Sequence, residues 1–232
     1  MDNKNIIIKI SRVHQALLKC HGIPAPKKYH RVLDSLVETI LSQNTSDSNS
    51  HRAYLSLKKH FPGWRAAAAA RPQAIEAAIR TGGLAKIKSL RISKLLNLIA
   101  REQGLISLEY LKKLSPEQAY HKLLSYGGVG PKTAACTLLF GAGMPVFPVD
   151  THVYRVGQRL GWMAPKESAE SFQERIGPLI PPAQVFNLHV NLITHGRQTC
   201  HPRQPDCEQC CLNIYCKYFK DSKPKNLKEE RP

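Results

Sequence analysis

SPEQAYHKLLSYGGVGPKTAACTLLFGAG, residues 115–143, is typical of two short helices joined by a tight glycine turn. Ser115–Gln118 supplies a capping serine, a proline for the first helical position and a glutamine that can bond back to the cap. A second helix is expected to begin at Pro131 and to end at Gly141 or Gly143, because glycine accepts the left-handed conformation that closes helices. This stretch therefore predicts a helix–turn–helix unit.

The rest of the chain carries similar helix signals. Further helices are predicted over Leu33–Leu41, from Ser46 and Asp47 to before Pro62, over Ala74–Arg80, Ile87–Arg101 and Thr151–Leu160, and from Pro182 to Gly196. Their apolar residues recur at the spacing of one helical face. No run alternates apolar and polar residues, and no Asn-Gly turn joins two apolar segments. The predicted fold class is all-α.

The chain is strongly basic. Lys and Arg number 34 against 17 Asp and Glu, which gives a net charge of +17. Such a surface attracts polyanions, and nucleic acid is the first candidate. A merely basic protein, or one that touches acidic membrane, is the alternative. Because the excess is spread along the chain and no basic amphipathic anchor stands out, nucleic acid is favoured and no membrane partner is expected.

Four cysteines near the C-terminus have the spacing C-x6-C-x2-C-x5-C, at Cys200, Cys207, Cys210 and Cys216. Two metal centres use four thiolates in one loop, a structural zinc ion or an iron–sulfur cluster. Zinc usually takes two C-x2-C pairs, and only Cys207 and Cys210 form one, so the spacing favours iron–sulfur. Cys211 can compete for a ligand position, which spacing alone does not settle.

The other two cysteines, Cys20 and Cys136, lie in apolar helical stretches and are predicted to behave as small hydrophobic residues outside the metal centre. The seven cysteines are odd in number, and neither a signal peptide nor a long apolar run is visible. These features predict a reducing, intracellular location, which we expect to be cytoplasmic, nucleoid-associated and of prokaryotic type.

The glycine turn and the residues after it carry the candidate chemistry. Gly128 and Gly130 let backbone N–H groups approach a DNA phosphate. Lys132 falls in the first turn of the following helix, where the helix dipole disfavours a cation, so it is better suited to act as an amine nucleophile than to add stability. A solvated lysine is the alternative. Asp150 is a good N-cap for the helix from Thr151, and capping would also hold its carboxylate in place.

Five segments together resemble endonuclease III, of the helix-hairpin-helix DNA glycosylase superfamily. They are Leu41–Asp47 (LSQNTSD), Gly128–Ala134 (GVGPKTA), Val149–His152 (VDTH), His195–Arg197 (HGR) and the four-cysteine run. They occur in the family's order and extend over nearly the whole chain. Two departures are visible: Tyr126-Gly127 replaces the frequent Leu-Pro before the turn, and Asn44 stands where endonuclease III often has glutamine.

The resemblance implies a two-domain helix-hairpin-helix glycosylase fold. Residues 31–143 would form a six-helix domain with the hairpin, and residues 1–30 and 144–219 would form the iron–sulfur cluster domain. The implied cofactor is a 4Fe–4S cluster on Cys200, Cys207, Cys210 and Cys216, with Cys211 left over. Residues 220–232 are charged, contain proline and few apolar residues, and are predicted to be disordered.

The resemblance also implies roles for individual residues. Lys132 matches the family's catalytic lysine and Asp150 its catalytic aspartate, while Leu84 resembles the wedge inserted where the damaged base leaves the stack. Gln43 or Asn44 resembles the polar residue that fills the vacated space. Further DNA contacts are expected from the turn Gly128, Val129 and Gly130 and from Lys86, Lys88, Arg91 and Lys94, for which a solvated basic face is the alternative.

The implied activity is a bifunctional DNA glycosylase and AP lyase of base excision repair. A monomer would bind double-stranded DNA with a damaged base or abasic site, release an oxidised pyrimidine and nick the strand through a lysine Schiff base. Two alternatives remain: a relative that removes mismatched uracil or thymine or oxidised guanine, and a DNA-binding module without catalysis.

Overall fold

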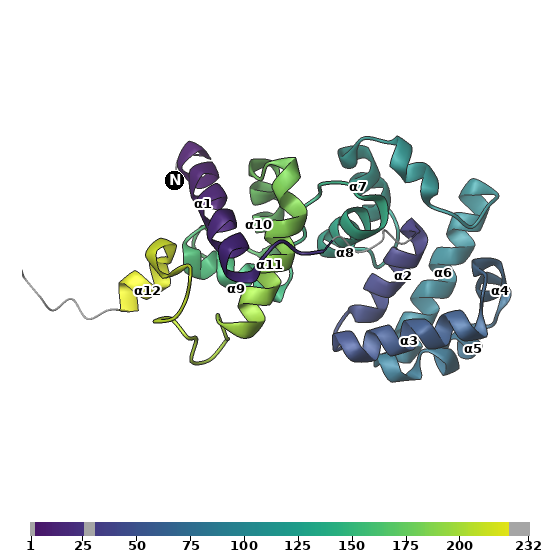
Figure 1. The fold of residues 1–232 in the computed structure, drawn as a ribbon. Coiled ribbons are helices and arrows are strands. Elements are labelled where there is room, and N and C mark those ends of the chain that lie inside the picture. The colour runs from purple at the N-terminus through teal and green to yellow at the C-terminus, as the bar shows by residue number, and fades with distance from the viewer. Residues whose placement is uncertain (1–2, 26–30, 223–232) are drawn as a thin grey trace, which may run out of the picture. The chain divides into compact units, whose positions relative to one another are not determined.

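The computed structural model describes residues 3–25 and 31–222, and every regular element in these ranges is helical (Figure 1). The all-α prediction is confirmed. The chain divides into two compact units: Lys27–Pro148 is continuous, whereas the other combines Met1–Pro26 with Val149–Pro232. We call them the central unit and the terminal unit. Within the described ranges, no helix is both long enough and apolar enough to cross a membrane.

The central unit is built around α2. Its helices are α2 (Val32–Ser42), α3 (Asp47–His60), α4 (Trp64–Ala69), α5 (Pro72–Ala78), α6 (Ala85–Gln103), α7 (Pro116–Leu124) and α8 (Pro131–Thr137). α2 packs against α3, α6 and α8. It is buried along nearly its whole length, from Val32 to Leu41, and its buried residues include the polar Asp34 and Ser35. Gln43 and Asn44 follow directly after the end of α2, so this buried helix determines where their loop begins.

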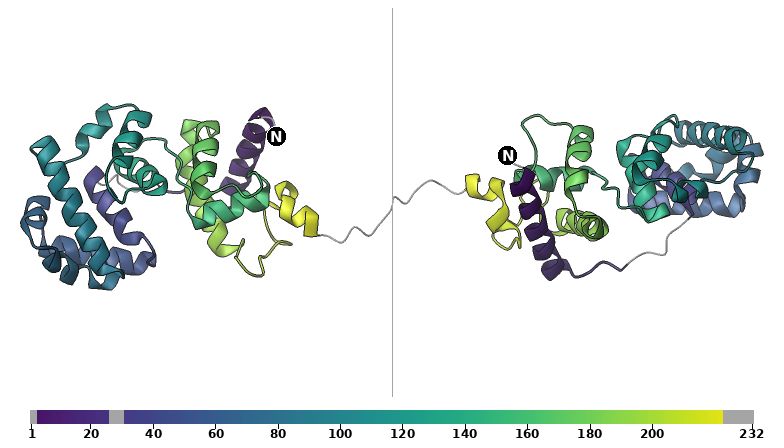
Figure 2. Two further views of the ribbon diagram at one scale, coloured as in Figure 1. Left: turned by 180° about the vertical axis from the view of Figure 1, so that it is seen from behind. Right: turned by 90° about the horizontal axis from the view of Figure 1, so that it is seen from above.

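The terminal unit brings the two ends of the chain together. Its helices are α1 (Asn3–His21), α9 (Thr151–Leu160), α10 (Ala169–Ile176), α11 (Val185–Gln198) and α12 (Lys217–Ser222). α11 packs against both α1 and α9 (Figure 2). A Cβ added to Gly196 would lie 2.9 Å from the Cβ of His152, so glycine is required where α11 passes α9.

Several predicted helix limits are confirmed and others are wrong. α9 spans the predicted Thr151–Leu160, and Gly143 closes the helix from Pro131, although its last turn, Leu138–Ala142, has π-helical bonding. Gly196 does not end its helix, because α11 continues to Gln198. The first residues of the predicted disordered tail, Lys220–Ser222, form the last turn of α12. The remainder of that tail, 223–232, lies outside the described residues.

Candidate active site and metal centre

The hairpin between α7 and α8 has the predicted capping box and glycine turn. The Ser115 hydroxyl accepts a hydrogen bond from the Gln118 N–H at 3.2 Å, and the Gln118 side chain accepts one from the Ser115 N–H at 3.1 Å. Gly128 has φ +84°, a conformation that L side chains rarely adopt. Val129 is buried, while Gly128 and Gly130 are exposed. The turn is thus anchored by its valine and presents its glycine backbone to solvent.

Lys132 stands in the first turn of α8, half-buried, beside a small polar network. Next to it, the hydroxyl of Thr133 accepts a hydrogen bond from Gln43 Nε2 at 3.1 Å. The Gln43 amide oxygen in turn accepts one from Arg91 Nη1. A Cβ on Gly128 would lie 2.3 Å from Arg91 Nε. The structure therefore brings together Gln43, Arg91 and the glycine turn, three separately predicted features, at the start of the helix that carries Lys132.

Leu84 and Asn44 are both exposed, and both have the left-handed backbone conformation. Leu84 has φ 49° and ψ 33° at the start of α6, and Asn44 has φ 51°. A non-glycine residue in this region costs roughly 1–3 kcal/mol and persists where the surroundings impose it. The Thr45 hydroxyl, next to Asn44, donates to the carbonyl oxygen of Gly82, which ties the two loops together. The predicted wedge is thus an apolar side chain held outward on a strained backbone.

The prediction that Lys88 contacts DNA phosphates is wrong. Its side chain is only 2% exposed, and its ammonium donates to Leu41 O at 2.6 Å, Thr45 Oγ1 at 2.7 Å and Gly82 O at 2.8 Å. Burial, and then the neighbouring charge of Arg91, lower the pKa of Lys88. All three ammonium protons are used inside the central unit, so this lysine supports the loops instead of facing solvent.

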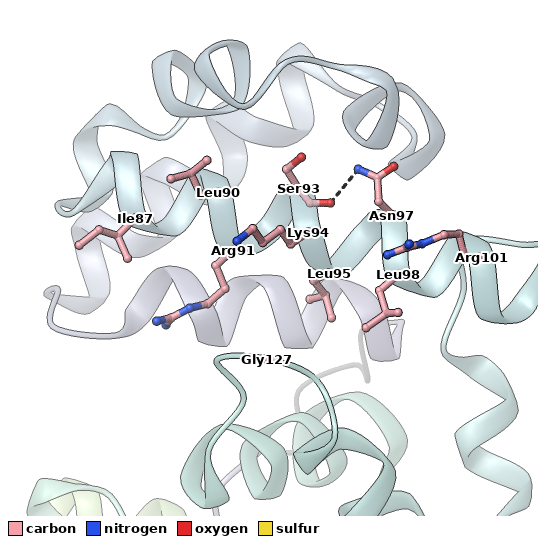
Figure 3. Close-up of a pocket in the computed structure, with 10 residues that line it drawn as sticks. All are labelled: Ile87, Leu90, Arg91, Ser93, Lys94, Leu95, Asn97, Leu98, Arg101 and Gly127. Atoms are coloured by element: carbon pink, nitrogen blue, oxygen red, sulfur yellow. Dashed lines mark hydrogen bonds between the residues drawn. The ribbon is translucent and has the colours of Figure 1, made fainter.

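The face of α6 beside Gly127 of the hairpin turn is a groove lined by both apolar and basic side chains (Figure 3). Ile87 and Leu90 are exposed apolar residues in it, and Arg91, Lys94 and Arg101 also line it. Of the predicted phosphate contacts, Lys86 and Lys94 are exposed on α6. The sequence indicated the basic residues of this face but not the apolar ones between them.

Asp150 caps α9, as predicted. Its Oδ1 accepts a hydrogen bond from the Val153 N–H at 2.8 Å. Asp150 belongs to the terminal unit and Lys132 to the central unit, and each is fixed within its own unit. The carboxylate is therefore held at the start of a helix, with one oxygen engaged by the backbone.

The four predicted metal-binding cysteines share one small cavity in the terminal unit. Arg159 lines the same cavity, and its Nη1 donates to Cys200 Sγ at 3.1 Å. The Leu212 N–H donates to Cys210 Sγ at 3.4 Å. Burial raises the pKa of Cys210 to about 11, although the hydrogen bond from the Leu212 N–H opposes this shift, so this sulfur stays protonated unless a metal ion stabilises the thiolate. Four converging thiols with N–H donors fit an iron–sulfur cluster.

Two residues that support this centre were not predicted. Arg159 also donates to His201 O at 2.7 Å and so holds the start of the cysteine loop. His195 is buried, and its Nε2 lies 3.4 Å from Cys210 Sγ. Burial, and then nearby His21, lower the pKa of His195 to about 4, so its imidazole is neutral. The position of His195 in the HGR segment, shortly before Cys200, was the available sequence signal.

Cys211 does not belong to the four-cysteine cavity. Its thiol is hydrogen-bonded to Cys20, the last but one residue of α1. The two sulfurs and a ring nitrogen of His21 all lie within 4.8 Å of one another. The prediction that Cys20 acts only as a small hydrophobic residue is therefore wrong, since it is exposed and faces two other metal-ligating side chains.

Comparisons with known proteins agree with this architecture. The model of the HhH-GPD superfamily of base excision DNA repair proteins matches residues 37–182. A putative DNA glycosylase of Arabidopsis thaliana is 43% identical over 183 residues, which is 79% of this chain but 60% of that protein. Endonuclease III of Thermotoga maritima is 30% identical over 80% of this chain and 82% of its own length.

The fold itself matches a solved endonuclease III–DNA complex with a TM-score of 0.77, over 95% of this chain and 98% of that one, at 22% identity. A thermostable thymine-DNA glycosylase matches with a TM-score of 0.75 at 19% identity. At these identities the likeness concerns the fold alone. Because the similar sequences come from a plant as well as from bacteria and archaea, they do not support the predicted prokaryotic-type location. With the matched family model spanning well over half of its length, the chain belongs to the HhH-GPD superfamily of base excision DNA repair proteins.

Proposed function

We propose that this protein is a bifunctional DNA glycosylase and AP lyase that acts on damaged bases in double-stranded DNA. The observation that carries the proposal is the position of Lys132, in the first turn of α8, directly after the exposed glycine turn and beside the network of Arg91, Gln43 and Thr133. An amine at this point lies next to a backbone that can hold a phosphate. The chain that carries the two catalytic candidates, Lys132 and Asp150, belongs to a superfamily of base excision DNA repair proteins.

Access to the glycosidic bond requires that the nucleotide leave the stack, which costs a few kcal/mol and less for a damaged base. The exposed side chain of Leu84 is suited to enter the space at the vacated step. Gln43 is tethered by Arg91 and Thr133, whereas Asn44 is exposed, so Asn44 is better placed to reach an unpaired base on the opposite strand. These contacts would hold the duplex open while the reaction proceeds.

The chemistry follows from an amine and a carboxylate. Lys132 Nζ attacks the sugar C1′, the bond from C1′ to the base breaks, and the base leaves with the electron pair and takes up a proton. Loss of the amine proton and opening of the sugar ring give a Schiff base at C1′. Asp150 accepts that proton or stabilises the positive charge that develops on the sugar. The Schiff base acidifies C2′–H, whose loss expels the 3′ phosphate, and water then releases the lysine.

The residues of the cysteine cavity fit a 4Fe–4S cluster on Cys200, Cys207, Cys210 and Cys216. When bound, the cluster supplies metal–thiolate bonds that hold residues 200–216 in one arrangement. Arg159 and His195 would steady two of those thiolates by N–H···S bonds. Anaerobically purified protein should contain about four iron atoms per chain. Cys207→Ser should lose the iron and Cys211→Ser should keep it. A single zinc ion with no iron would contradict the assignment.

We further propose oxidised pyrimidines as the substrate class. An assay of strand nicking across duplexes with oxidised pyrimidine, mismatched uracil or thymine, and oxidised guanine separates this specificity from the alternatives. Binding to all of these duplexes without base release or nicking would identify a non-catalytic module instead.

The decisive experiment traps the intermediate. Borohydride added during turnover should reduce the Schiff base to a stable protein–DNA crosslink, visible as a shift on a denaturing gel. Lys132→Gln should abolish crosslinking and nicking while lesion binding persists. Asp150→Asn should slow base release far more than it weakens binding, because its charge matters mainly in the transition state. Lys59→Gln, an exposed lysine on α3, is the matched control and should trap normally. A folded Lys132→Gln protein that still crosslinks would overturn the mechanism.

A further inference from the structure

A second cluster of metal-ligating side chains lies in the terminal unit, where the two ends of the chain meet. Cys20 and His21 are the last two residues of α1, and Cys211 belongs to the loop between α11 and α12. One ligand atom from each lies within 4.8 Å of the other two. We propose that these three side chains bind a thiophilic divalent cation, with Zn²⁺ as the best match, at a site distinct from the four-cysteine centre.

Two consecutive cysteines, Cys210 and Cys211, belong to the two different sites. Cys210 lines the cavity with the other three predicted cluster ligands. Cys211 instead hydrogen-bonds to Cys20. Cys211, which the family resemblance left outside the cluster, therefore has a partner in α1, far away in the sequence.

The donor set suits zinc. Two thiolates and one imidazole are borderline-to-soft ligands, which zinc prefers over oxygen ligands. Two sulfurs bound to one tetrahedral zinc ion lie about 3.8 Å apart, given Zn–S bonds of about 2.3 Å. Shifts on the order of 1 Å would therefore close the site. Cys20 is exposed, which leaves room for this adjustment and for a water molecule at the fourth position.

The end of α1, which carries Cys20 and His21, is held against α11 by a hydrogen bond. The side chain of Asn191, buried on α11, donates to the Gly22 carbonyl oxygen at 3.0 Å. Gly22 itself bonds back to Leu18 O at 2.9 Å with a left-handed φ of +79°. Cys20 and His21 thus sit on a helix end that is fixed against α11, so little conformational entropy is lost when an ion binds.

A chain of imidazoles orients His21. His195 Nε2 lies 3.4 Å from Cys210 Sγ, and a metal-bound thiolate there could only accept a hydrogen bond, so His195 would donate from Nε2. His195 Nδ1 then accepts from His21 Nε2, 3.3 Å away. His21 Nδ1 would then be left for the ion, while its other ring nitrogen donates to a neighbour, as in metal-ligating histidines generally.

The test uses the cluster-loaded protein. After treatment with EDTA and then Zn²⁺, gel-filtered protein should contain one zinc per chain in addition to its iron, both measured by elemental analysis. The double variant Cys20→Ser/Cys211→Ser should lose the zinc and keep the iron, and His21→Ala should also lose the zinc. Cys136→Ser, in the central unit, is the matched control and should retain both metals. Zn²⁺ should also protect exposed Cys20 from alkylation, measured by mass spectrometry on the unmodified protein, which needs no variant to fold.

Three results would overturn the proposal: no zinc retained by the iron-loaded protein, zinc retained in full by the double variant, or zinc gained only as iron is lost. The last would place the zinc at the four-cysteine centre. The readout is metal content, so a negative result leaves the proposed chemistry of Lys132 untouched.

Discussion

Lys88 holds its positive charge inside the central unit, with three oxygen acceptors around it. Glutamine is uncharged and has two N–H donors where the ammonium has three, so Lys88→Gln loses at least one hydrogen bond from a charged donor and should lower the free energy of unfolding by about 2 kcal/mol or more. Lys86→Gln, two positions away and exposed, should change it by less than about 0.5 kcal/mol. Urea unfolding of both variants checks this, and equal effects would contradict the structural role of Lys88.

Leu84 has a strained backbone and an exposed side chain, so its effect on protein stability can be separated from its effect on base release. Leu84→Gly relieves the left-handed backbone, whereas Leu84→Ala keeps that strain, and both remove the wedge. We expect the glycine variant to be more stable than the alanine variant by about 1 kcal/mol in thermal unfolding. Single-turnover base release should be slower than wild type in both. Normal release by both variants would exclude Leu84 as the wedge.

At the scale of elements, the segment between α9 and α10 depends on one ion pair. Glu167 accepts two hydrogen bonds from Arg175 at 2.7 Å and one from the Ala164 N–H at 2.8 Å. The bonds from Arg175, the largest cause, lower the pKa of Glu167. Its contribution to stability is therefore present above the unfolded pKa of about 4.3 and is lost as pH falls through the lower folded pKa.

Glu167→Gln should consequently destabilise the protein at neutral pH by about 2 kcal/mol. The difference from wild type should narrow as the pH is lowered below about 4.3, measured by urea unfolding of both proteins at each pH. Glu174→Gln, exposed on α10 beside Arg175, is the control, and its free energy of unfolding should follow that of wild type throughout. If the difference in unfolding free energy between Glu167→Gln and wild type does not change with pH, the ion pair adds nothing to the pH dependence of stability.

Local signals in the sequence were sufficient for most helices of the central unit. Ser46 and Ser115 accept from the backbone N–H groups that their cap positions predicted. These features act over three or four residues, so they are visible without tertiary information. The end of α11 was not predictable in this way, because Gly196 is required by the approach of His152, a contact between distant segments.

In the candidate site, too, some residues could be predicted from local sequence and others depend on contacts between distant segments. Lys132, Asp150 and the four cysteines were predicted from motifs, and the structure adds the local contacts around each of them. The burial of Lys88 and the pairing of Cys20 with Cys211 both depend on segments far apart in sequence. A lysine on a predicted basic face and a buried one look alike in sequence, since both can lie among charged neighbours. Only the folded chain distinguishes them.

At the scale of the whole molecule, the net charge of +17 predicts DNA binding that is dominated by phosphates. Affinity for undamaged duplex should fall steeply with salt, by about 0.9 log units per log unit of salt for each phosphate neutralised. Lys86→Glu/Lys94→Glu should flatten this slope, because both lysines are exposed on α6. Lys59→Glu on α3, which lowers the net charge without altering this face, should flatten it less. Identical slopes for these variants would show that α6 does not contact DNA.

The packing of α1 against α11 has a consequence for how the protein is made. His21 and His195, which touch in the finished terminal unit, are separated by 174 positions. A ribosome releases the chain from its N-terminus and domains tend to fold as they emerge. The central unit can therefore complete its core while α1, already synthesised, still lacks its partner. Until translation reaches α11, the apolar side of α1, with Ile10, Val13 and Leu17, has no α11 to pack against on the nascent chain.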